Sequence, residues 1–222
     1  MEDLIRKENG IFDILQKFID AKLDFIVVGG YAVSAFKHGF SIDVDVVVQS
    51  KDLDKFEAIV NEEGFKKTRE KELEDIYSSK FIRYEKDSAS VDFLIEAVVA
   101  RATGASFSYQ ILADNSTEKR IIGIEKEISA QVPIREMIIA MKVHSGRLTD
   151  FRDIAALARG TDLDKIRSFL FIGDLKALHS QLKELARIVK DKNFVDSFKG
   201  VFIEKKFDVD MNQVEKISKL KQ

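Results

Sequence analysis

The feature that most constrains the fold is a pair of short apolar runs, each joined to residues that an ordinary buried strand does not carry. The first run, residues 25–28 (FIVV), is followed directly by Gly29-Gly30, and the second, residues 42–48 (IDVDVVV), contains two aspartates. Runs of β-branched residues bounded by glycine favour buried strands. Residues 31–42 between them suffice for one short helix and a return. The sequence therefore predicts two neighbouring strands with the glycines and the aspartates at the same end of a sheet.

The two aspartates of the second run are spaced for one face of a strand. Asp43 and Asp45 project to one side, while Val44, Val46 and Val48 point to the other. Two carboxylates this close repel each other, and beside an apolar strand they are unfavourable unless a cation compensates. The alternative interpretation of an isolated pair is a solvated sheet face with two polar residues.

Two further features of the sequence make a solvated sheet face a weaker explanation for Asp43 and Asp45. Gly29 and Gly30 stand at the predicted strand-to-helix turn, where backbone N–H groups and the positive end of a helix can approach a phosphate, although many strands use glycine only to turn. Asp92 interrupts another apolar run, residues 91–95. If its strand pairs with the Asp43 strand, three carboxylates form a cluster that holds two divalent ions, or holds one and supplies a general base. An edge-strand aspartate facing water is the alternative for Asp92.

Composition limits the chemistry available. The 222 residues contain no cysteine, which excludes disulfides, thiolate zinc sites and cysteine nucleophiles. With only three histidines, a catalytic metal would be held mainly by oxygen, which favours magnesium or manganese. The 36 basic and 38 acidic residues nearly balance, so net charge gives no reason to expect bulk attraction to nucleic acid. No segment has the length of a membrane span or the pattern of a signal peptide, and we expect a cytoplasmic protein.

The remaining periodicity predicts an α+β fold. Strands are predicted at residues 25–28, 42–48, 81–84 and 91–95, the last two joined by the turn KDSAS, and two more within 120–132 meeting near Gly123. Helices are predicted at residues 10–22, 31–38, 53–63, 134–145, 149–159, 163–171 and 174–190, with Pro133 opening the fourth. A mixed sheet of at least four strands flanked by helices is therefore expected in residues 1–132, and a helical domain packing on it in residues 133–222.

A lysine stands at the edge of the first helix of the second half. Ile134, Met137, Ile138 and Met141 form an apolar stripe, and Lys142 lies at its margin, where a lysine usually extends to solvent. Asp150 and Asp153 share one face of the next helix and can pair with Lys142 or Arg147. The alternative is a helix N-terminus that carries acids because the helix dipole favours them.

Residues 25–48 (FIVVGGYAVSAFKHGFSIDVDVVV) resemble the signature of the nucleotidyltransferase superfamily, in which Gly-Gly or Gly-Ser is followed by D-x-D and a later third aspartate. Within it the chain is most similar to the minimal nucleotidyltransferases of the AbiEii abortive-infection toxin type. Residues 133–157 (PIREMIIAMKVHSGRLTDFRDIAAL) resemble that group's helical motif. The resemblance covers roughly residues 25–160 and implies a polymerase-beta-like fold with a nucleotidyltransferase core in residues 1–132.

The resemblance implies transfer of a nucleoside monophosphate from an NTP to a hydroxyl, with release of pyrophosphate. Asp43, Asp45 and Asp92 would bind magnesium or manganese, and Asp92 would also activate or position the acceptor. The resemblance also implies that Lys142 is a catalytic residue near the nucleotide. The residues that would bind the nucleotide are Gly29, Gly30, Ser41, Arg147, Asp150 and Asp153. Many relatives carry an arginine near the position of Gly39. This chain does not, so Lys37 or His38 is expected to substitute, or triphosphate binding to be weaker.

The acceptor is not defined by the sequence. RNA such as tRNA, a protein and a small molecule all remain candidates, and the AbiEii-type resemblance favours a toxin with an antitoxin partner. An antibiotic-modifying transferase is a rival, on the thin basis of the acidic run Glu70 to Asp75. A nucleotide-binding regulator that has lost turnover is another rival, and the presence of the third carboxylate, Asp92, argues against it.

Overall fold

The structure is a computed structural model that describes residues 2–39, 41–73, 77, 79–191, 193–194 and 209–222. The chain divides into two compact units, which are described separately. Unit 1 contains residues 1–99 and 107–133, and unit 2 contains residues 100–106 and 134–222. No helix in the described part of the chain has the length and apolar character needed to cross a membrane.

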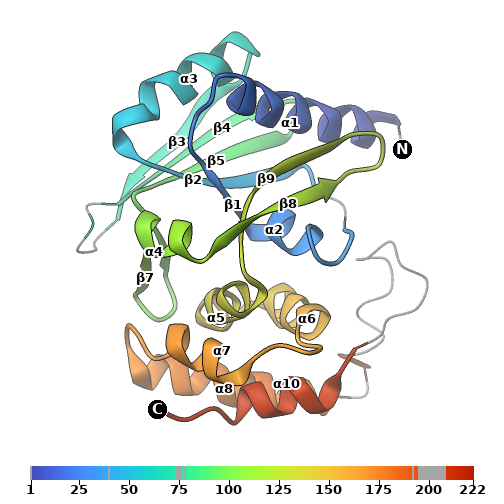
Figure 1. The fold of residues 1–222 in the computed structure, drawn as a ribbon, viewed down its shortest axis with the longest axis vertical. Coiled ribbons are helices and arrows are strands. Elements are labelled where there is room, and N and C mark those ends of the chain that lie inside the picture. Colours follow the sequence, from blue (N-terminus) through green and yellow to red (C-terminus); the bar gives the residue numbers. More distant parts are fainter. Residues whose placement is uncertain (1, 40, 74–76, 78, 192, 195–208) are drawn as a thin grey trace. The chain divides into compact units, whose positions relative to one another are not determined.

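Unit 1 is built on a seven-stranded mixed sheet (Figure 1). The order is β3-β4-β5-β2-β1-β9-β8, with β2 parallel to β5, β1 parallel to β9 and the other neighbours antiparallel. The strands are β1 Ile26–Val28, β2 Asp43–Val48, β3 Lys66–Glu72, β4 Lys80–Lys86, β5 Ala89–Ile95, β8 Ser116–Ile122 and β9 Glu127–Pro133. A separate two-stranded sheet joins β6 Ala97–Ala100 to β7 Ala105–Ser108. The predicted pairing of the glycine and D-x-D strands is confirmed by β1 and β2. The D-x-D and Asp92 strands are β2 and β5, which also pair, so the condition for a cluster of three carboxylates is met.

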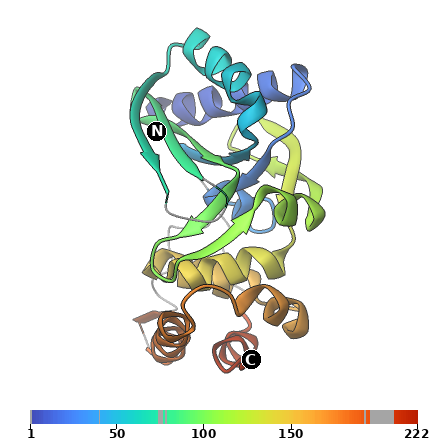
Figure 2. The ribbon, with the colours of Figure 1, turned by 90° about the vertical axis from the view of Figure 1, so that its left-hand side faces the viewer.

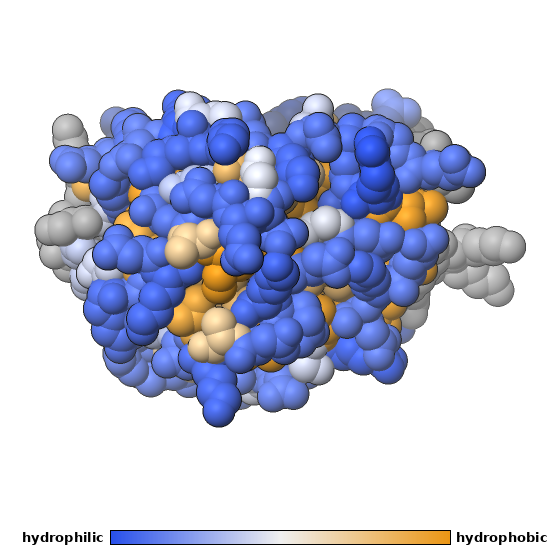
Figure 3. All heavy atoms as spheres, turned by 90° about the horizontal axis from the view of Figure 1, so that it is seen from above, coloured by the Kyte–Doolittle hydropathy of each residue, from blue (hydrophilic) through white to orange (hydrophobic). Residues whose placement is uncertain are grey.

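Helices α1 (Glu2–Asp20) and α3 (Leu53–Glu62) cover one face of this sheet (Figure 1). Their contact is aromatic: Phe18 of α1 packs against Phe56 of α3 and Phe93 of β5, with ring centroids 4.8 and 6.1 Å away. Seen from outside α1 and α3, charged and polar side chains cover most of the surface, with apolar atoms in patches between them (Figure 3). Because side chains alternate along a strand, the residues next to Phe93 face the opposite side of the sheet, away from α1 and α3.

Several expectations for unit 1 need correction. The first helix starts at Glu2 and not near residue 10, because its charged first turns pair among themselves, as Lys7 does with Asp3. The helix predicted over residues 31–38 is α2, Gly29–Ser34. Strand β3 was not predicted, because every residue of KKTREKE is exposed and the run has no apolar alternation. The short elements β6, β7, η1 (Ser50–Asp52) and α4 (Tyr109–Asp114) were also missed.

Unit 2 contains the predicted run of helices. They are α5 Arg135–Ser145, α6 Leu148–Leu157, α7 Leu163–Leu170 and α8 Leu175–Ile188, followed by α10 Met211–Ser218, which was not predicted. Helix α5 packs against α6, α7 and α8, and α10 packs against α8 (Figure 2). Pro133 ends β9 and does not open the helix, which begins at Arg135.

Buried His144 links parts of unit 2 that are far apart in sequence. Its ring nitrogens lie 2.9 Å from Thr103 Oγ1 and 2.9 Å from the Leu170 carbonyl oxygen. Burial lowers the pKa of His144 to about 4, so the ring is neutral at pH 7. The neutral ring can donate to Leu170 and accept from Thr103. We therefore regard His144 as a structural histidine.

Candidate active site

Strand β2 presents its two aspartates on the face opposite α1 and α3. Val44, Val46 and Val48 are fully buried on the helix side, whereas Asp43 is exposed and Asp45 is half-buried. The Ser90 hydroxyl of β5 donates a hydrogen bond of 2.9 Å to Asp43 Oδ1. Strand β2 thus has buried valines on one face and accessible carboxylates on the other, as the alternation predicts.

The register places charged residues of three strands in one cross-strand row. Asp45 of β2 is the partner of Asp92 in β5, and Asp92 is the partner of Arg83 in β4. Register partners in adjacent strands project to the same face and are about 5 Å apart. Asp43, Asp45 and Asp92 therefore share one face of the sheet, and Arg83 joins them there.

The first glycine lies directly against this row. Val28 at the end of β1 is the register partner of Asp45, and Gly29 follows with a φ of +65°. A Cβ atom on Gly29 would lie 2.0 Å from Asp45 Oδ2, so a side chain there would have to displace the Asp45 carboxylate. Gly30 is exposed, and a Cβ atom on it would lie 3.7 Å from Ser41 Oγ. Glycine is thus required at position 29 by both the backbone conformation and the aspartate.

Ser41 shapes the start of β2. Its hydroxyl donates to the Asp43 carbonyl oxygen at 2.9 Å and accepts from the Asp43 N–H at 3.2 Å, while its own carbonyl accepts from the Tyr31 hydroxyl at 2.6 Å. A phosphate contact of Ser41 stays a prediction. His38, a predicted substitute for the missing arginine, lies close enough to Glu8 of α1 to influence that carboxyl group.

Asp92 is buried and paired. It is 4% exposed, and Arg83 donates to both of its oxygens, from Nε to Oδ1 at 2.7 Å and from Nη2 to Oδ2 at 2.6 Å. Burial raises the pKa of Asp92, and the arginine opposes that rise. Asp92 does not face water as an edge residue, because β5 lies between β4 and β2.

The carboxylates fit a hard divalent cation in their chemistry. Asp43 and Asp45 offer oxygen ligands of the kind that Mg²⁺ prefers, on one face of one strand, beside a glycine cradle that a Cβ atom would fill. Within the described ranges, no group of three or more histidine, cysteine, aspartate or glutamate side chains is arranged to hold a metal ion. Both oxygens of the third carboxylate, Asp92, accept hydrogen bonds from Arg83, and the role of Asp92 as a metal ligand stays a prediction.

The second predicted set of residues forms a buried ionic network in unit 2. Lys142 of α5 is 9% exposed, and its ammonium group lies 3.0 Å from Asp150 Oδ1 and 2.7 Å from Asp153 Oδ2 of α6. Burial alone would lower the pKa of Lys142, but the two carboxylates raise it, so the lysine is charged. The lysine therefore does not extend to solvent, and the predicted charge pairing with the two aspartates is confirmed.

Arg147 completes this network and caps α6. Its Nε donates to Asp150 Oδ2 at 2.7 Å, and its backbone N–H donates to the same oxygen at 3.1 Å. Asp150 thereby caps the helix N-terminus while it forms ion pairs with both Lys142 and Arg147, so both interpretations of this aspartate hold. The nucleotide-binding roles of Lys142, Arg147, Asp150 and Asp153 stay predictions.

Sequence reasoning missed two residues of the carboxylate face, Arg83 and Ser90. Both contacts join residues on different strands, so they depend on a register that the pattern of either strand alone does not fix. A partial signal exists in FIRYEK, where Arg83 lies between buried Ile82 and Tyr84 and must project to the other face.

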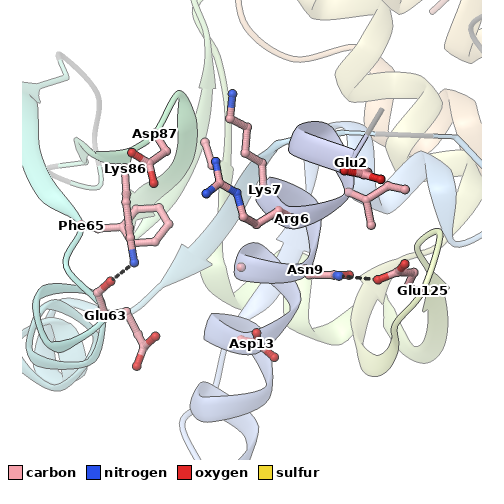
Figure 4. Close-up of a pocket in the computed structure, with 13 residues that line it drawn as sticks. Glu2, Arg6, Lys7, Asn9, Asp13, Glu63, Phe65, Lys86, Asp87 and Glu125 are labelled. Atoms are coloured by element: carbon pink, nitrogen blue, oxygen red, sulfur yellow. Dashed lines mark hydrogen bonds between the residues drawn. The ribbon is translucent and has the colours of Figure 1, made fainter.

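A cleft of about 560 Å³ lies elsewhere on unit 1, between α1 and the β4–β5 turn (Figure 4). Polar groups that line the cleft form hydrogen bonds with one another: Lys86 donates to the Glu63 carbonyl oxygen at 2.7 Å, and Asn9 donates to Glu125 at 2.7 Å. None of the predicted site residues lines it. The carboxylate face, and not this cleft, is therefore the candidate active site.

Comparison with protein-family models and with curated proteins gives no match. The solved structures that are similar in fold include the following two. One is the crystal structure of ANT(2")-Ia in complex with adenylyl-2"-tobramycin, at 16% identity, covering 77% of this chain and 95% of that chain, with a TM-score of 0.52. The other is a candidate nucleotidyltransferase from H. pylori, at 17% identity, covering 98% of this chain and 94% of that chain, with a TM-score of 0.50. The chain therefore has the nucleotidyltransferase fold, as the resemblance implied.

Proposed function

We propose that the chain, which has the nucleotidyltransferase fold, transfers a nucleoside monophosphate from an NTP to a hydroxyl acceptor and releases pyrophosphate. The observation that carries this proposal is the juxtaposition of Asp45 with Gly29 on one side and Asp92 on the other. It combines a side-chain-free approach for phosphates with carboxylates for a cation, which are the two requirements of the donor half of this reaction.

In this proposal Asp43 and Asp45 hold magnesium or manganese. Bound to these two carboxylates, a divalent ion would supply positive charge to neutralise the triphosphate. The Gly29-Gly30 turn has no side chains, so its backbone N–H groups are proposed to bind phosphate oxygens near Asp45, at the start of α2, where the helix dipole favours anions. The exposed Ser41–Asp43 turn lies next to Gly30 and is available to a phosphate on the same side.

Asp92 is the proposed group that orients or deprotonates the acceptor hydroxyl. Its burial raises the carboxyl pKa, which makes it a better proton acceptor than an ordinary aspartate. Its register with Asp45 supports a position beside the reacting phosphorus. Both oxygens of Asp92 accept hydrogen bonds from Arg83, and the binding of a metal ion by Asp92 stays a prediction.

Lys142 and Arg147 are proposed to bind the nucleotide. The exposed fraction of the Arg147 side chain is 70%, so it can reach a ligand without leaving Asp150. Lys142 is held by Asp150 and Asp153, so its proposed contribution is a fixed positive charge and not a mobile ligand. Asp153 and Asp150 would then act through these cations.

The acceptor is the open part of the proposal. The AbiEii-type resemblance favours a cytoplasmic toxin that modifies RNA such as tRNA and is countered by an antitoxin. An antibiotic acceptor has less support from the chain itself: Glu74 and Asp75 of the acidic run lie outside the described residues, and Glu70 is paired with Lys67 and Lys80. A regulator without turnover would retain nucleotide binding alone.

One assay separates these functions. The protein is incubated with Mg²⁺ and each NTP in turn, labelled on the α- or the γ-phosphate, together with total tRNA, cell protein or an aminoglycoside. We expect α-label on one acceptor class and release of pyrophosphate. Transfer of γ-label would contradict the proposal, and saturable nucleotide binding without any transfer would favour the regulator. The acceptor that becomes labelled identifies the substrate class.

A further inference from the structure

Tyr31 joins the glycine turn to the segment that leads into the D-x-D strand. It directly follows Gly29-Gly30 in α2, and its hydroxyl donates a hydrogen bond of 2.6 Å to the Ser41 carbonyl oxygen. The side chain is 1% exposed, and its ring packs against Phe12 of α1 in a T-shaped arrangement, with ring centroids 5.7 Å apart. A buried tyrosine hydroxyl usually has a hydrogen-bond partner, and here that partner is the backbone just before β2.

Ser41 connects Tyr31 to Asp43. The Ser41 hydroxyl donates to the Asp43 carbonyl oxygen at 2.9 Å and accepts from the Asp43 N–H at 3.2 Å. Ser41 thus binds the tyrosine through its carbonyl group and the aspartate through its side chain. The Ser34 hydroxyl, also in α2, lies 3.1 Å from the Gly39 carbonyl oxygen. Helix α2 therefore holds this segment at more than one point.

Strand β5 holds Asp43 from the other side. The Ser90 hydroxyl donates to Asp43 Oδ1 at 2.9 Å, and the Ser90 N–H donates to the Ile42 carbonyl oxygen at 3.1 Å. Asp43 therefore lies between an anchor on β5 and an anchor that runs through Ser41 to Tyr31. A metal ligand binds best when it is already held in place, because freedom that is lost on binding weakens affinity.

The Tyr31 hydroxyl remains a hydrogen-bond donor at neutral pH. Burial raises the pKa of this hydroxyl, and the negative charges of Glu8 and Asp43 add to the rise. The phenol therefore stays protonated, and it can donate to the Ser41 carbonyl oxygen throughout the pH range in which most enzymes work. The influence of Asp43 on the phenol also indicates that these two side chains lie near each other.

We propose that Tyr31 is a positioning residue of this site, and that it fixes the proposed metal ligand Asp43 against the glycine turn of α2. The inference rests on the proposed function, because it concerns the same metal ligand. Tyr31 acts through Ser41, to which its hydroxyl is bonded. Loss of that hydroxyl should therefore weaken metal binding, in addition to lowering the stability of the fold.

Tyr31→Phe removes only the hydroxyl, and Tyr84→Phe is the matched control. Tyr84 is 2% exposed and donates to Glu57 at 2.6 Å, but it belongs to β4 and faces α3. Its acceptor is a charged carboxylate, so Tyr84→Phe should lower the urea midpoint at least as much as Tyr31→Phe. Mn²⁺ alone is then titrated into each folded full chain, and binding is followed by electron paramagnetic resonance. We expect the dissociation constant to rise at least about threefold in Tyr31→Phe and to stay unchanged in Tyr84→Phe.

Equal dissociation constants in folded Tyr31→Phe and Tyr84→Phe would overturn the inference. Absence of Mn²⁺ binding by the wild type would instead overturn the metal site of the proposed function, and the inference with it.

Ser41→Ala tests the route from Tyr31 to Asp43. This variant should itself bind Mn²⁺ more weakly, and adding Tyr31→Phe to it should weaken binding by a smaller factor than in the wild type, because residues that act through one another are not additive. The same factor in both backgrounds would overturn the route through Ser41. If Tyr31→Phe does not fold, Ser41→Ala decides: weaker Mn²⁺ binding supports the inference, and unchanged binding overturns it.

Discussion

Gly29 and Asp45 are in such close contact that a methyl group on the glycine would lie 2.0 Å from Asp45 Oδ2. The contact joins the end of β1 to the middle of β2, since Val28 and Asp45 are register partners. It couples the proposed phosphate-binding turn to the proposed metal ligand. A change on one side of this contact must move the other.

Gly29→Ala should therefore damage activity beyond its cost in stability. Alanine at a positive φ costs roughly 1 kcal/mol, and the added methyl group must also displace the Asp45 carboxylate. Gly104→Ala is the matched control, because Gly104 has the same φ of +65° and no atom within 4 Å of an added Cβ. We expect transferase activity to fall at least about tenfold in Gly29→Ala relative to Gly104→Ala. Equal activities in the two folded variants would show that the contact is unimportant.

Lys142→Met should destabilise the protein strongly. The change leaves Asp150 and Asp153 buried without their shared cation, and breaking a buried ion pair in this way costs roughly 3–5 kcal/mol. Lys176→Met is the control, because Lys176 is an exposed lysine of α8. This change should lower the free energy of unfolding by under about 0.5 kcal/mol. Urea denaturation of the two variants measures the difference. Similar midpoints would mean that the buried network contributes little to the fold.

His144 predicts a loss of stability in acid. Its pKa is lowered from 6.5 to about 4, so its neutral form stabilises the folded state fully above pH 6.5, and this contribution is lost as the pH falls toward 4. The complete shift corresponds to roughly 3 kcal/mol. His144→Gln should show a shallower fall in unfolding free energy between pH 6.5 and 4 than His179→Gln, which changes an exposed histidine. Parallel curves for the two variants would contradict the assignment.

The central strands were predictable because each carries its own signal. Strands β1, β2 and β5 are short apolar runs bounded by turn residues, and aspartates in such runs have few structural explanations. Strand β3 lacks that signal. All seven of its residues are exposed, and it is a strand only because β4 offers a free edge to pair with.

The candidate site was likewise predictable only where a local sequence pattern marks its residues. Asp43, Asp45 and Gly29 follow from local pattern, whereas the partner of Asp92 depends on the register of β4 against β5. For Lys142, the helix stripe alone indicated a position at the solvent boundary. Asp150 and Asp153 from α6 instead enclose its ammonium group. For these site residues, the sequence predicted the strands and helices but not the contacts between them.

The most direct test of the central claim compares Asp45→Asn with Asp54→Asn in transfer of α-labelled nucleotide. Asp54 is an exposed aspartate of α3, so its variant controls for the same chemical change in the same unit. Asparagine at position 45 keeps the shape of the side chain but removes the charge that the metal ion requires. We predict that label transfer falls at least about a hundredfold in Asp45→Asn, a barrier increase of roughly 3 kcal/mol, and is unchanged in Asp54→Asn. Undiminished transfer by folded Asp45→Asn would contradict the account.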